Sequence, residues 1–289
     1  MPRLTSSPAG TVDIGDLRVQ RLGFGSMRLA LTRSADGERS REAAHALIRR
    51  AVERGVTFID TANIYGLGRS EELIAEALRP YPLDVVVGTK SGYETRSLAP
   101  GEQRLPASGH PDHLISECER SLARLGVERI DLYQLHTPDP VVPLADSLGA
   151  LVELQQQGKI RHIGISNVSP EQLDEARSIC RIVSVQNRYN AGDRSSEELL
   201  RMCERLGIVF IPWHPIVRDE QRMRIAESIA TAHGATAQQV TIAWLLQRSP
   251  VVLPIPGTTS AGHLDVNIDA AWIRLTDDEF ARLGATVDG

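Results

Sequence analysis

Cysteine is scarce in this 289-residue chain. Cys118, Cys180 and Cys203 stand far apart, and none of them belongs to a CxxC pair. An odd and widely spaced set does not suit a disulfide framework, and a chain of this length buries enough surface to fold without one. The pattern is typical of a reducing compartment. We therefore expect a cytoplasmic protein whose cysteines are small buried residues.

Long apolar runs and an excess of positive charge are also missing. No run reaches the roughly 18 residues of a membrane span, and the first ten residues lack the apolar segment of a signal peptide. The net charge is −5, which disfavours nucleic acid and anionic membranes as partners. Neither HExxH, nor clustered Cys and His, nor GxSxG occurs, so we expect no bound metal and no serine triad.

Short apolar runs alternate with helical patterns along most of the chain. Repeated βα units imply parallel strands, and eight such units can close into a barrel. We predict an α/β fold, a (β/α)8 TIM barrel in one domain over residues 1–289, with a hairpin at 11–20 and extra C-terminal helices at 261–271 and 276–283. The eight strands are expected at 18–25, 56–60, 84–90, 129–135, 159–165, 182–186, 208–211 and 251–255.

The alternative is an open doubly wound sheet, which would usually carry a nucleotide fingerprint in its first βα turn. The first expected strand, 18–25, ends in the segment GFGSMRL at 23–29, but its glycines do not match GxGxxG. We expect a tight turn there, with no helix starting at once. The barrel is therefore the favoured architecture.

Polar side chains that follow successive strands converge on one face of a barrel. Here one strand ends on Asp60, with Tyr65 five residues later among glycines, and the next two end on Lys90 and His136. These residue types can form a proton-transfer set. A phenol has a pKa near 10, and a nearby ammonium would lower it while a carboxylate holds that ammonium charged. The histidine can orient a substrate oxygen by a hydrogen bond.

The chain resembles the aldo-keto reductases along almost its whole length. The resemblance is carried by several motifs in order: GVTFIDTANIYGLGRSEELIAEAL, GTK, DLYQLH, GKIRHIGISN, VQNRYN and LPIPGTTS. It implies hydride transfer between NADP(H) and a carbonyl or alcohol. It also implies a catalytic tetrad of Asp60, Tyr65, Lys90 and His136, in which Tyr65 donates the proton.

The resemblance further implies a cofactor site at the same rim. Ser166, Asn167 and Gln186 would bind the nicotinamide carboxamide, and Trp213 would stack on the ring. The remaining cofactor candidates are Asp60 and two groups at the first and last strand ends: Gly25, Ser26 and Met27, and Gly257, Thr258, Thr259, His263 and Asn267. Many family members carry Arg or Lys for the 2′-phosphate where this chain has Ser260 and His263, so NAD(H) stays an alternative to NADP(H).

The substrate is left open by the sequence. By position, the substrate contacts are expected at Arg28, Ile64, Tyr93, His136 and His214. The loop after Lys90 resembles the bacterial branch of the family with pyridoxal reductases and pyridoxine 4-dehydrogenases, which suggests a pyridoxal-like aldehyde. A sugar or polyketide ketone fits equally. We expect a monomer or small homo-oligomer; the alternative function is a redox-sensing regulatory subunit that binds the cofactor with little turnover.

Overall fold

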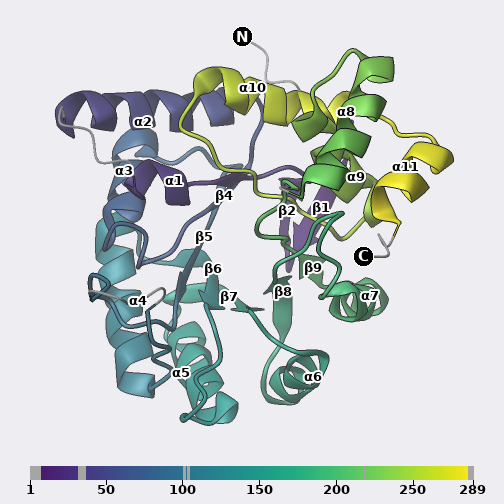
Figure 1. Cartoon of the computed structure of the whole chain (residues 1–289). Coiled ribbons are helices and arrows are strands. Elements are labelled where there is room, and N and C mark those ends of the chain that lie inside the picture. Colours follow the sequence, from purple (N-terminus) through teal and green to yellow (C-terminus); the bar gives the residue numbers. More distant parts are fainter. Residues whose placement is uncertain (1–7, 32–36, 100–101, 103–104, 218, 286–289) are drawn as a thin grey trace.

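A small antiparallel hairpin and a curled parallel sheet organise the structure (Figure 1). The computed structural model describes residues 8–31, 37–99, 102, 105–217 and 219–285. The hairpin consists of β1 (Thr11–Ile14) and β2 (Leu17–Gln20), with Ile14 opposite Leu17 across the turn. Gly15 in that turn has a φ of 66°, a left-handed value that glycine adopts without a steric cost. The predicted hairpin over 11–20 is confirmed.

The larger sheet pairs seven parallel strands in chain order within the described residues. Each strand is followed by at least one helix, so every connection crosses over the outside of the sheet (Figure 1). This is the repeated βα unit predicted for the barrel. The strands are β3 (Phe24–Gly25), β4 (Phe58–Asp60), β5 (Val86–Ser91), β6 (Ile130–Leu135), β7 (Ile160–Ser166), β8 (Ile182–Gln186) and β9 (Val209–Phe210).

The eighth predicted strand, 251–255, closes the ring although it is not regular β-structure. On one side, Phe210 N donates to Val251 O and Leu253 N donates to Phe210 O, both at 2.9 Å. On the other side, Gly23 N donates to Pro254 O, also at 2.9 Å. The pairing with β9 is a single bridge between Phe210 and Val252, and Pro254 has no N–H to donate on the side that faces Gly23. The (β/α)8 prediction is therefore confirmed.

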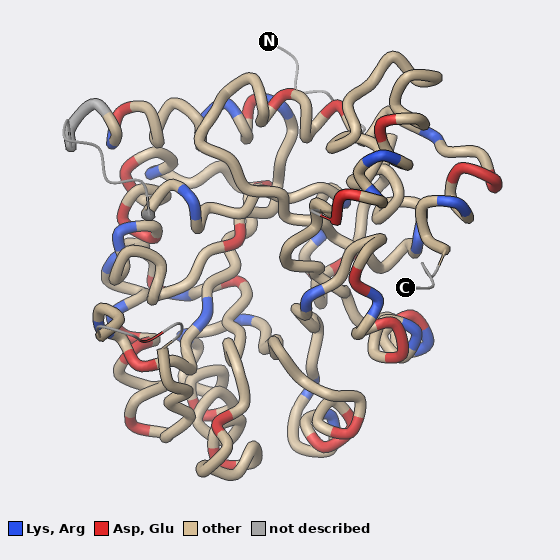
Figure 2. The backbone as a smooth tube through the Cα atoms, viewed as in Figure 1, with Lys and Arg blue, Asp and Glu red and all other residues tan. Residues whose placement is uncertain are grey.

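Helices surround the sheet, and most of them carry both acidic and basic residues (Figure 2). Helix α4 shows how the sequence sets their bounds: Pro111 occupies its first turn, and Gly126 ends it with a φ of 64°. No helix in the described part of the chain is long and apolar enough to cross a membrane. The helices are α1 (Met27–Leu31), α2 (Gly37–Glu53), α3 (Arg69–Leu78), α4 (Pro111–Leu125), α5 (Leu144–Gln156), α6 (Pro170–Ile179), α7 (Glu197–Leu206), α8 (Glu220–His233), α9 (Ala237–Arg248), α10 (Ala261–Asp269), the 3₁₀ turn η1 (Ala270–Trp272) and α11 (Asp277–Gly284).

Two predictions near the first strand are wrong. The stretch 18–25 is not one strand, because Leu17–Gln20 pairs within the hairpin and only Phe24–Gly25 joins the barrel. A helix also starts at once after β3, contrary to expectation. Its first turn is set by Ser26, whose carbonyl accepts from Leu29 N at 2.9 Å while its own N and Oγ both donate to Asp60 O.

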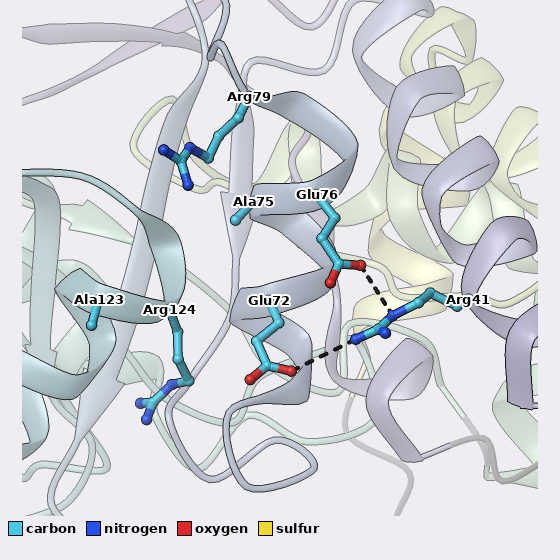
Figure 3. A pocket seen from close by; sticks show the side chains of 7 residues that line it. All are labelled: Arg41, Glu72, Ala75, Glu76, Arg79, Ala123 and Arg124. Atoms are coloured by element: carbon cyan, nitrogen blue, oxygen red, sulfur yellow. Dashed lines mark ion pairs between the residues drawn. The ribbon is translucent and has the colours of Figure 1, made fainter.

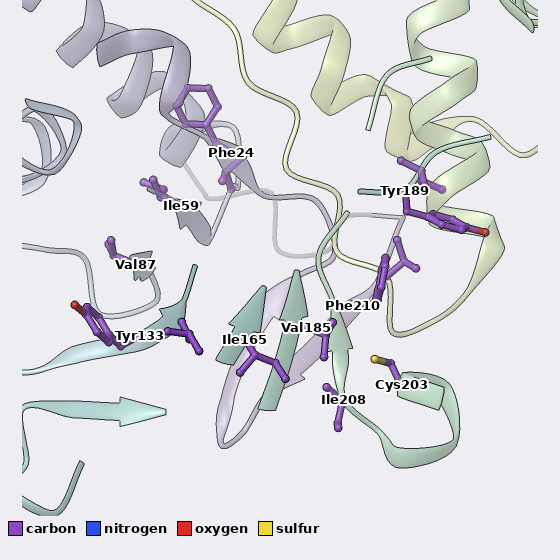
Figure 4. Close-up of a cluster of buried hydrophobic side chains, with 14 of the residues drawn as sticks. Phe24, Ile59, Val87, Tyr133, Ile165, Val185, Tyr189, Cys203, Ile208 and Phe210 are labelled. Atoms are coloured by element: carbon purple, nitrogen blue, oxygen red, sulfur yellow. The ribbon is translucent and has the colours of Figure 1, made fainter. Parts of the chain in front are cut away.

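Most buried apolar residues form two layers, one on each side of the strands, and a small third cluster lies between α9 and the 3₁₀ turn η1. Outward-facing residues of all seven strands, among them Phe24, Tyr133 and Phe210, pack against the helices (Figure 4). The inner layer fills the barrel, and Ile14 and Val19 of the hairpin complete it, at 0% and 1% exposure. The hairpin therefore plugs the amino-terminal end of the barrel. Only the carboxyl end is left for a site.

Candidate active site

Asp60 and Lys90 form a buried ion pair at the carboxyl end of the barrel. Asp60 is the last residue of β4, and Lys90 lies near the end of the adjacent β5. Lys90 Nζ donates to Asp60 Oδ1 at 2.7 Å, to Asp60 Oδ2 at 2.8 Å and to Thr61 O at 2.7 Å. All three ammonium protons thus have acceptors, as a lysine with 0% exposure requires.

Tyr65 lies over this pair in the loop between β4 and α3. Its ring centroid is 5.4 Å from Lys90 Nζ and 6.1 Å from the His136 ring, which it meets edge-on. Gly66, Leu67 and Gly68 follow with φ values of 63°, 57° and 95°, so three successive left-handed residues turn the chain. A Cβ on Gly66 would lie 3.0 Å from the backbone of Ala30 in α1, so this tight packing favours glycine.

The pKa of Tyr65 is raised, which corrects the expectation that Lys90 lowers it. Burial is the main cause, and the Asp60 carboxylate and Tyr93 add to it. The Asp60 carboxylate, whose Oδ1 lies 2.7 Å from Lys90 Nζ, opposes the effect that the ammonium would have on a phenolate. Burial also lowers the pKa of Lys90, against the opposing effect of Asp60. In this structure Tyr65 is a neutral phenol, able to give a proton.

His136 follows β6 directly and is a neutral imidazole. Burial, together with the charge of Lys90, lowers the pKa of His136 well below its ordinary value of 6.5. Its Nδ1 atom is buried and has no hydrogen-bond partner among the described residues. Tyr93 packs edge-on against the ring with centroids 4.8 Å apart. The predicted tetrad is thus brought together, with Tyr93 at its border.

The residues predicted to bind a nicotinamide form one hydrogen-bonded cluster beside Asp60. Gln186 Nε2 donates to Asp60 Oδ1 at 2.9 Å, and Ser166 Oγ donates to Gln186 O at 2.6 Å. Asn167 Nδ2 donates to His136 O at 2.9 Å, while its Oδ1 accepts from Trp213 Nε1 at 3.0 Å. Asn167 has a φ of 58°, a conformation that Asn tolerates better than most residues. The cluster fixes the Trp213 ring relative to the tetrad.

The residues predicted to hold the adenosine phosphate end lie where the barrel closes. Gly25 and Gly257 face each other so closely that a Cβ on Gly257 would lie 2.5 Å from Gly25 O. Next along the chain, Thr258 Oγ1 accepts from Ser260 N at 3.1 Å, and Ser260 caps α10. Asn267 in α10 is 1% exposed, and its Nδ2 has no partner in the described structure.

The other predicted residues lie on loops and first helical turns at the same rim. Met27 and Arg28 begin α1 and are exposed, and Ile64 is half-buried directly before Tyr65. His214 is exposed and meets the Trp213 ring edge-on at 5.2 Å. Thr259 and His263 are exposed at the start of α10.

Sequence reasoning missed the buried acids behind the tetrad. Glu71 in α3 and Glu117 in α4 are both 0% exposed. Glu71 accepts from Thr89 Oγ1, beside Lys90, at 2.6 Å and from Arg124 Nε at 2.6 Å. Both acids stand in charged helical stretches, where the sequence gives no sign that they point inward. Their burial with specific partners is the signal that only the structure supplies.

Two surface cavities lie away from these residues. A groove of about 650 Å³ runs over α2, α3 and α4, where Arg41 pairs with Glu76 at 3.0 Å and with Glu72 at 3.9 Å (Figure 3). A second cavity of about 370 Å³ adjoins the hairpin turn at Gly15 and includes Cys180. All three cysteines are free, and no group of acids, histidines or cysteines in the described residues could hold a metal ion.

Comparison with known families decides the relationship. The pattern of the Aldo/keto reductase family matches residues 21–288. The chain belongs to this family.

Individual members are similar over nearly the full length of both chains. An uncharacterized oxidoreductase of Schizosaccharomyces pombe is 40% identical over 280 residues, 96% of this chain and 90% of that protein. Pyridoxine 4-dehydrogenase of Escherichia coli is 37% identical over 286 residues, covering 95% and 97%. Among solved structures, an aldo-keto reductase from Klebsiella pneumoniae in complex with NADPH is 27% identical, with a TM-score of 0.79 and coverage of 94% and 93%. By its sequence and fold, this protein is thus an oxidoreductase of the aldo-keto reductase type.

Proposed function

We propose that this protein is an NADP(H)-dependent carbonyl reductase in which Tyr65 is the proton donor. The observation that carries the proposal is the Tyr65 phenol, neutral and 5.4 Å from a lysine whose charge is fully engaged by Asp60. A neutral phenol beside neutral His136 suits protonation of an oxygen that becomes an alkoxide. The alcohol-to-carbonyl direction would use the same groups in reverse.

The residues at the rim fit the cofactor. Asn267 Nδ2 is a buried donor without a partner, and α10 presents its N-terminus after Thr258 and Ser260, where an anionic phosphate would be stabilised. An NADPH complex of a family member with a TM-score of 0.79 supports this assignment. When bound, NADPH supplies a hydride to the carbonyl carbon. Gln186, Asn167 and Ser166 would hold the carboxamide end beside Trp213, and His263 in the first turn of α10 would bind a 2′-phosphate.

Each tetrad member has a separate task in this proposal. Tyr65 gives its hydroxyl proton to the substrate oxygen as the hydride arrives. His136 hydrogen-bonds the same oxygen and orients it, since its depressed pKa keeps it neutral. Lys90 and Asp60 form a fixed polar environment beneath the phenol. Because these groups are already oriented, they need not rearrange during the reaction.

The substrate we propose first is a pyridoxal-like aldehyde. Support comes from the 37% identity to pyridoxine 4-dehydrogenase, and the half-buried Tyr93 ring beside His136 offers a face for a planar ring. Sugar and polyketide ketones remain the competing class. We further propose that the protein acts in the cytoplasm, as a monomer or small homo-oligomer, with its three cysteines free as in a reducing compartment.

The test is turnover. Purified protein is mixed with NADPH and a panel containing pyridoxal, aliphatic aldehydes, sugars and cyclic ketones, and absorbance of the reduced nicotinamide is followed. Oxidation of NADPH with at least one carbonyl is expected, and a parallel series with NADH measures the cofactor preference. Tight NADPH binding without turnover of any carbonyl would contradict the proposal and support the regulatory alternative.

A further inference from the structure

Glu117 is a fully buried carboxylate on α4, yet it has no part in the tetrad. It accepts from Asn63 Nδ2 at 2.7 Å and from the Thr95 hydroxyl, and Arg120 on the next turn of α4 pairs with it from outside. Burial acts to raise the pKa of Glu117, but these hydrogen bonds and the Arg120 charge together lower it. Glu117 is therefore an ionised group held behind the site.

The partners of Glu117 come from two loops that form the site. Asn63 belongs to the Tyr65 loop, residues 61–68, and stands two positions before Tyr65. Thr95 belongs to the Tyr93 loop, residues 92–97, and stands two positions after Tyr93. Asn63 Nδ2 also donates to Thr95 Oγ1 at 3.1 Å, which closes a triangle with the carboxylate.

The two loops have few other ties to each other in the described structure. Asn63 N donates to Lys90 O at 3.1 Å, so the Tyr65 loop is also fixed to β5. The Tyr93 loop is fixed by backbone bonds to residues 106–108, from Glu94 N to Pro106 O at 3.0 Å and from Ser108 N to Gly92 O at 2.9 Å. It is also fixed from α4, where the His113 ring hydrogen-bonds Tyr93 O at 3.0 Å. Between them, the Glu117 triangle is the polar contact that sets the spacing of Tyr65 and Tyr93, whose rings both meet His136.

We propose that Glu117 is a positioning residue that fixes the Tyr65 loop and the Tyr93 loop relative to each other. The Tyr65 hydroxyl and the Tyr93 ring then face the same substrate. This inference rests on the proposed function for its catalytic consequence. The anchoring itself is a property of the fold. Glu117 touches neither substrate nor cofactor in this account and acts only through Asn63 and Thr95.

The first test is kinetic and uses a matched control. Glu117→Gln keeps the shape of the side chain but removes the charge and one of the two acceptor oxygens, so the side chain can no longer accept from both loops as the carboxylate does. It is expected to lower kcat about tenfold or more with the Kd for NADPH within about twofold, because small misplacements of a reacting group are costly. Glu119→Gln alters the exposed acid two residues away, which pairs with Lys159, and should leave kcat unchanged.

A second variant separates the two loops. Thr95→Val removes only the hydroxyl of the Tyr93 loop and leaves the Asn63–Glu117 bond in place. Its expected effect is a severalfold higher KM with kcat within about twofold, since Tyr93 belongs to the proposed substrate wall and not to the proton donor. If Glu117→Gln folds poorly, the KM of Thr95→Val is the measurement that tests the positioning role.

Rescue distinguishes positioning from a general loss of structure. In Asn63→Asp/Glu117→Gln the contact is restored with its polarity reversed, because the Gln amide can donate to the new carboxylate. This double variant should regain most of the kcat lost in Glu117→Gln. Parent-like kcat in Glu117→Gln, or no recovery in the double variant, would overturn the proposal.

Amide hydrogen exchange tests whether Glu117 holds the two loops, and the measurement needs no catalytic turnover. Glu117→Gln should speed amide exchange in both 61–68 and 92–97, whereas Glu119→Gln should change neither. If the parent protein reduced no carbonyl, the proposed function would be overturned, and the exchange data would decide the anchor on their own. Unchanged exchange in both loops would show that Glu117 does not hold them.

Discussion

The Lys90–Asp60 pair ties the stability of the barrel to its chemistry. Lys90→Met removes one partner and leaves Asp60 buried with an uncompensated charge, which is expected to cost about 3–5 kcal/mol of unfolding free energy. Denaturant unfolding measures the loss. Asp60→Asn/Lys90→Met, in which both charges are absent, should recover most of it. A single-variant loss below about 1 kcal/mol would mean that the pair is not sealed from water as described.

Burial of His136 predicts how stability depends on pH. The folded-state pKa of His136 lies below its unfolded value near 6.5, so the unfolded chain takes up more protons as pH falls below that value. Stability should therefore decrease between about pH 7 and pH 5, and His136→Gln should reduce this slope. Thermal unfolding at several pH values measures it. His263→Gln, at an exposed position, is the control, and an equal slope in the parent and His136→Gln would refute the assignment.

The site residues differ in how far the sequence could reveal them. Asp60, Lys90 and His136 were found because a barrel gathers the residues at its strand ends, whatever their separation in the chain. The predicted direction of the Tyr65 pKa shift is wrong because burial by surrounding side chains outweighs one nearby charge. The extent of that burial cannot be read from the sequence. Glu117 was missed for the same reason: beside Glu119 and Arg120 it looks like one more solvated helix residue.

Among the elements, the turns that close the barrel are the most sensitive to added atoms. A Cβ on Gly257 would lie 2.5 Å from a backbone oxygen that cannot move freely, so Gly257→Ala should destabilise the fold by about 1–3 kcal/mol. Gly149→Ala is the matched control. Gly149 is exposed in α5 with nothing within 4 Å of its added Cβ, and alanine there should stabilise by about 0.5–1 kcal/mol. Urea unfolding compares the two, and equal effects would contradict the close approach.

The sequence predicted the capped C-terminal helices better than the short elements near β3. The helices expected at 261–271 and 276–283 are observed, within one residue at each end, as α10 continued by η1 and as α11, because Ser260 and Thr276 cap their starts. The stretch 18–25 was misjudged because alternation continues from the hairpin toward β3, and pairing partners, not residue types, divide it. Helix α1 has only five residues, too few to show a period.

For the molecule as a whole, the hairpin plug separates stability from function. Ile14 is 0% exposed in the inner layer at the end opposite the site, so Ile14→Ala should cost about 2–5 kcal/mol. The kcat and KM of the folded fraction should stay within about twofold, because the hairpin lies at the end of the barrel opposite the site. We expect one cooperative unfolding transition for parent and variant, in keeping with the proposed single domain over 1–289. A variant with normal stability would show that the hairpin does not complete the core.

The central claim is that Tyr65 supplies the proton, and Tyr65→Phe tests it most directly. The change removes one oxygen and keeps the ring that packs against His136. Rates of NADPH oxidation with the best carbonyl are measured beside NADPH binding by fluorescence. We expect kcat to fall by at least about a hundredfold, the scale of general acid catalysis, with the Kd for NADPH within about twofold. Turnover as fast as the parent, with the cofactor still bound, would contradict it.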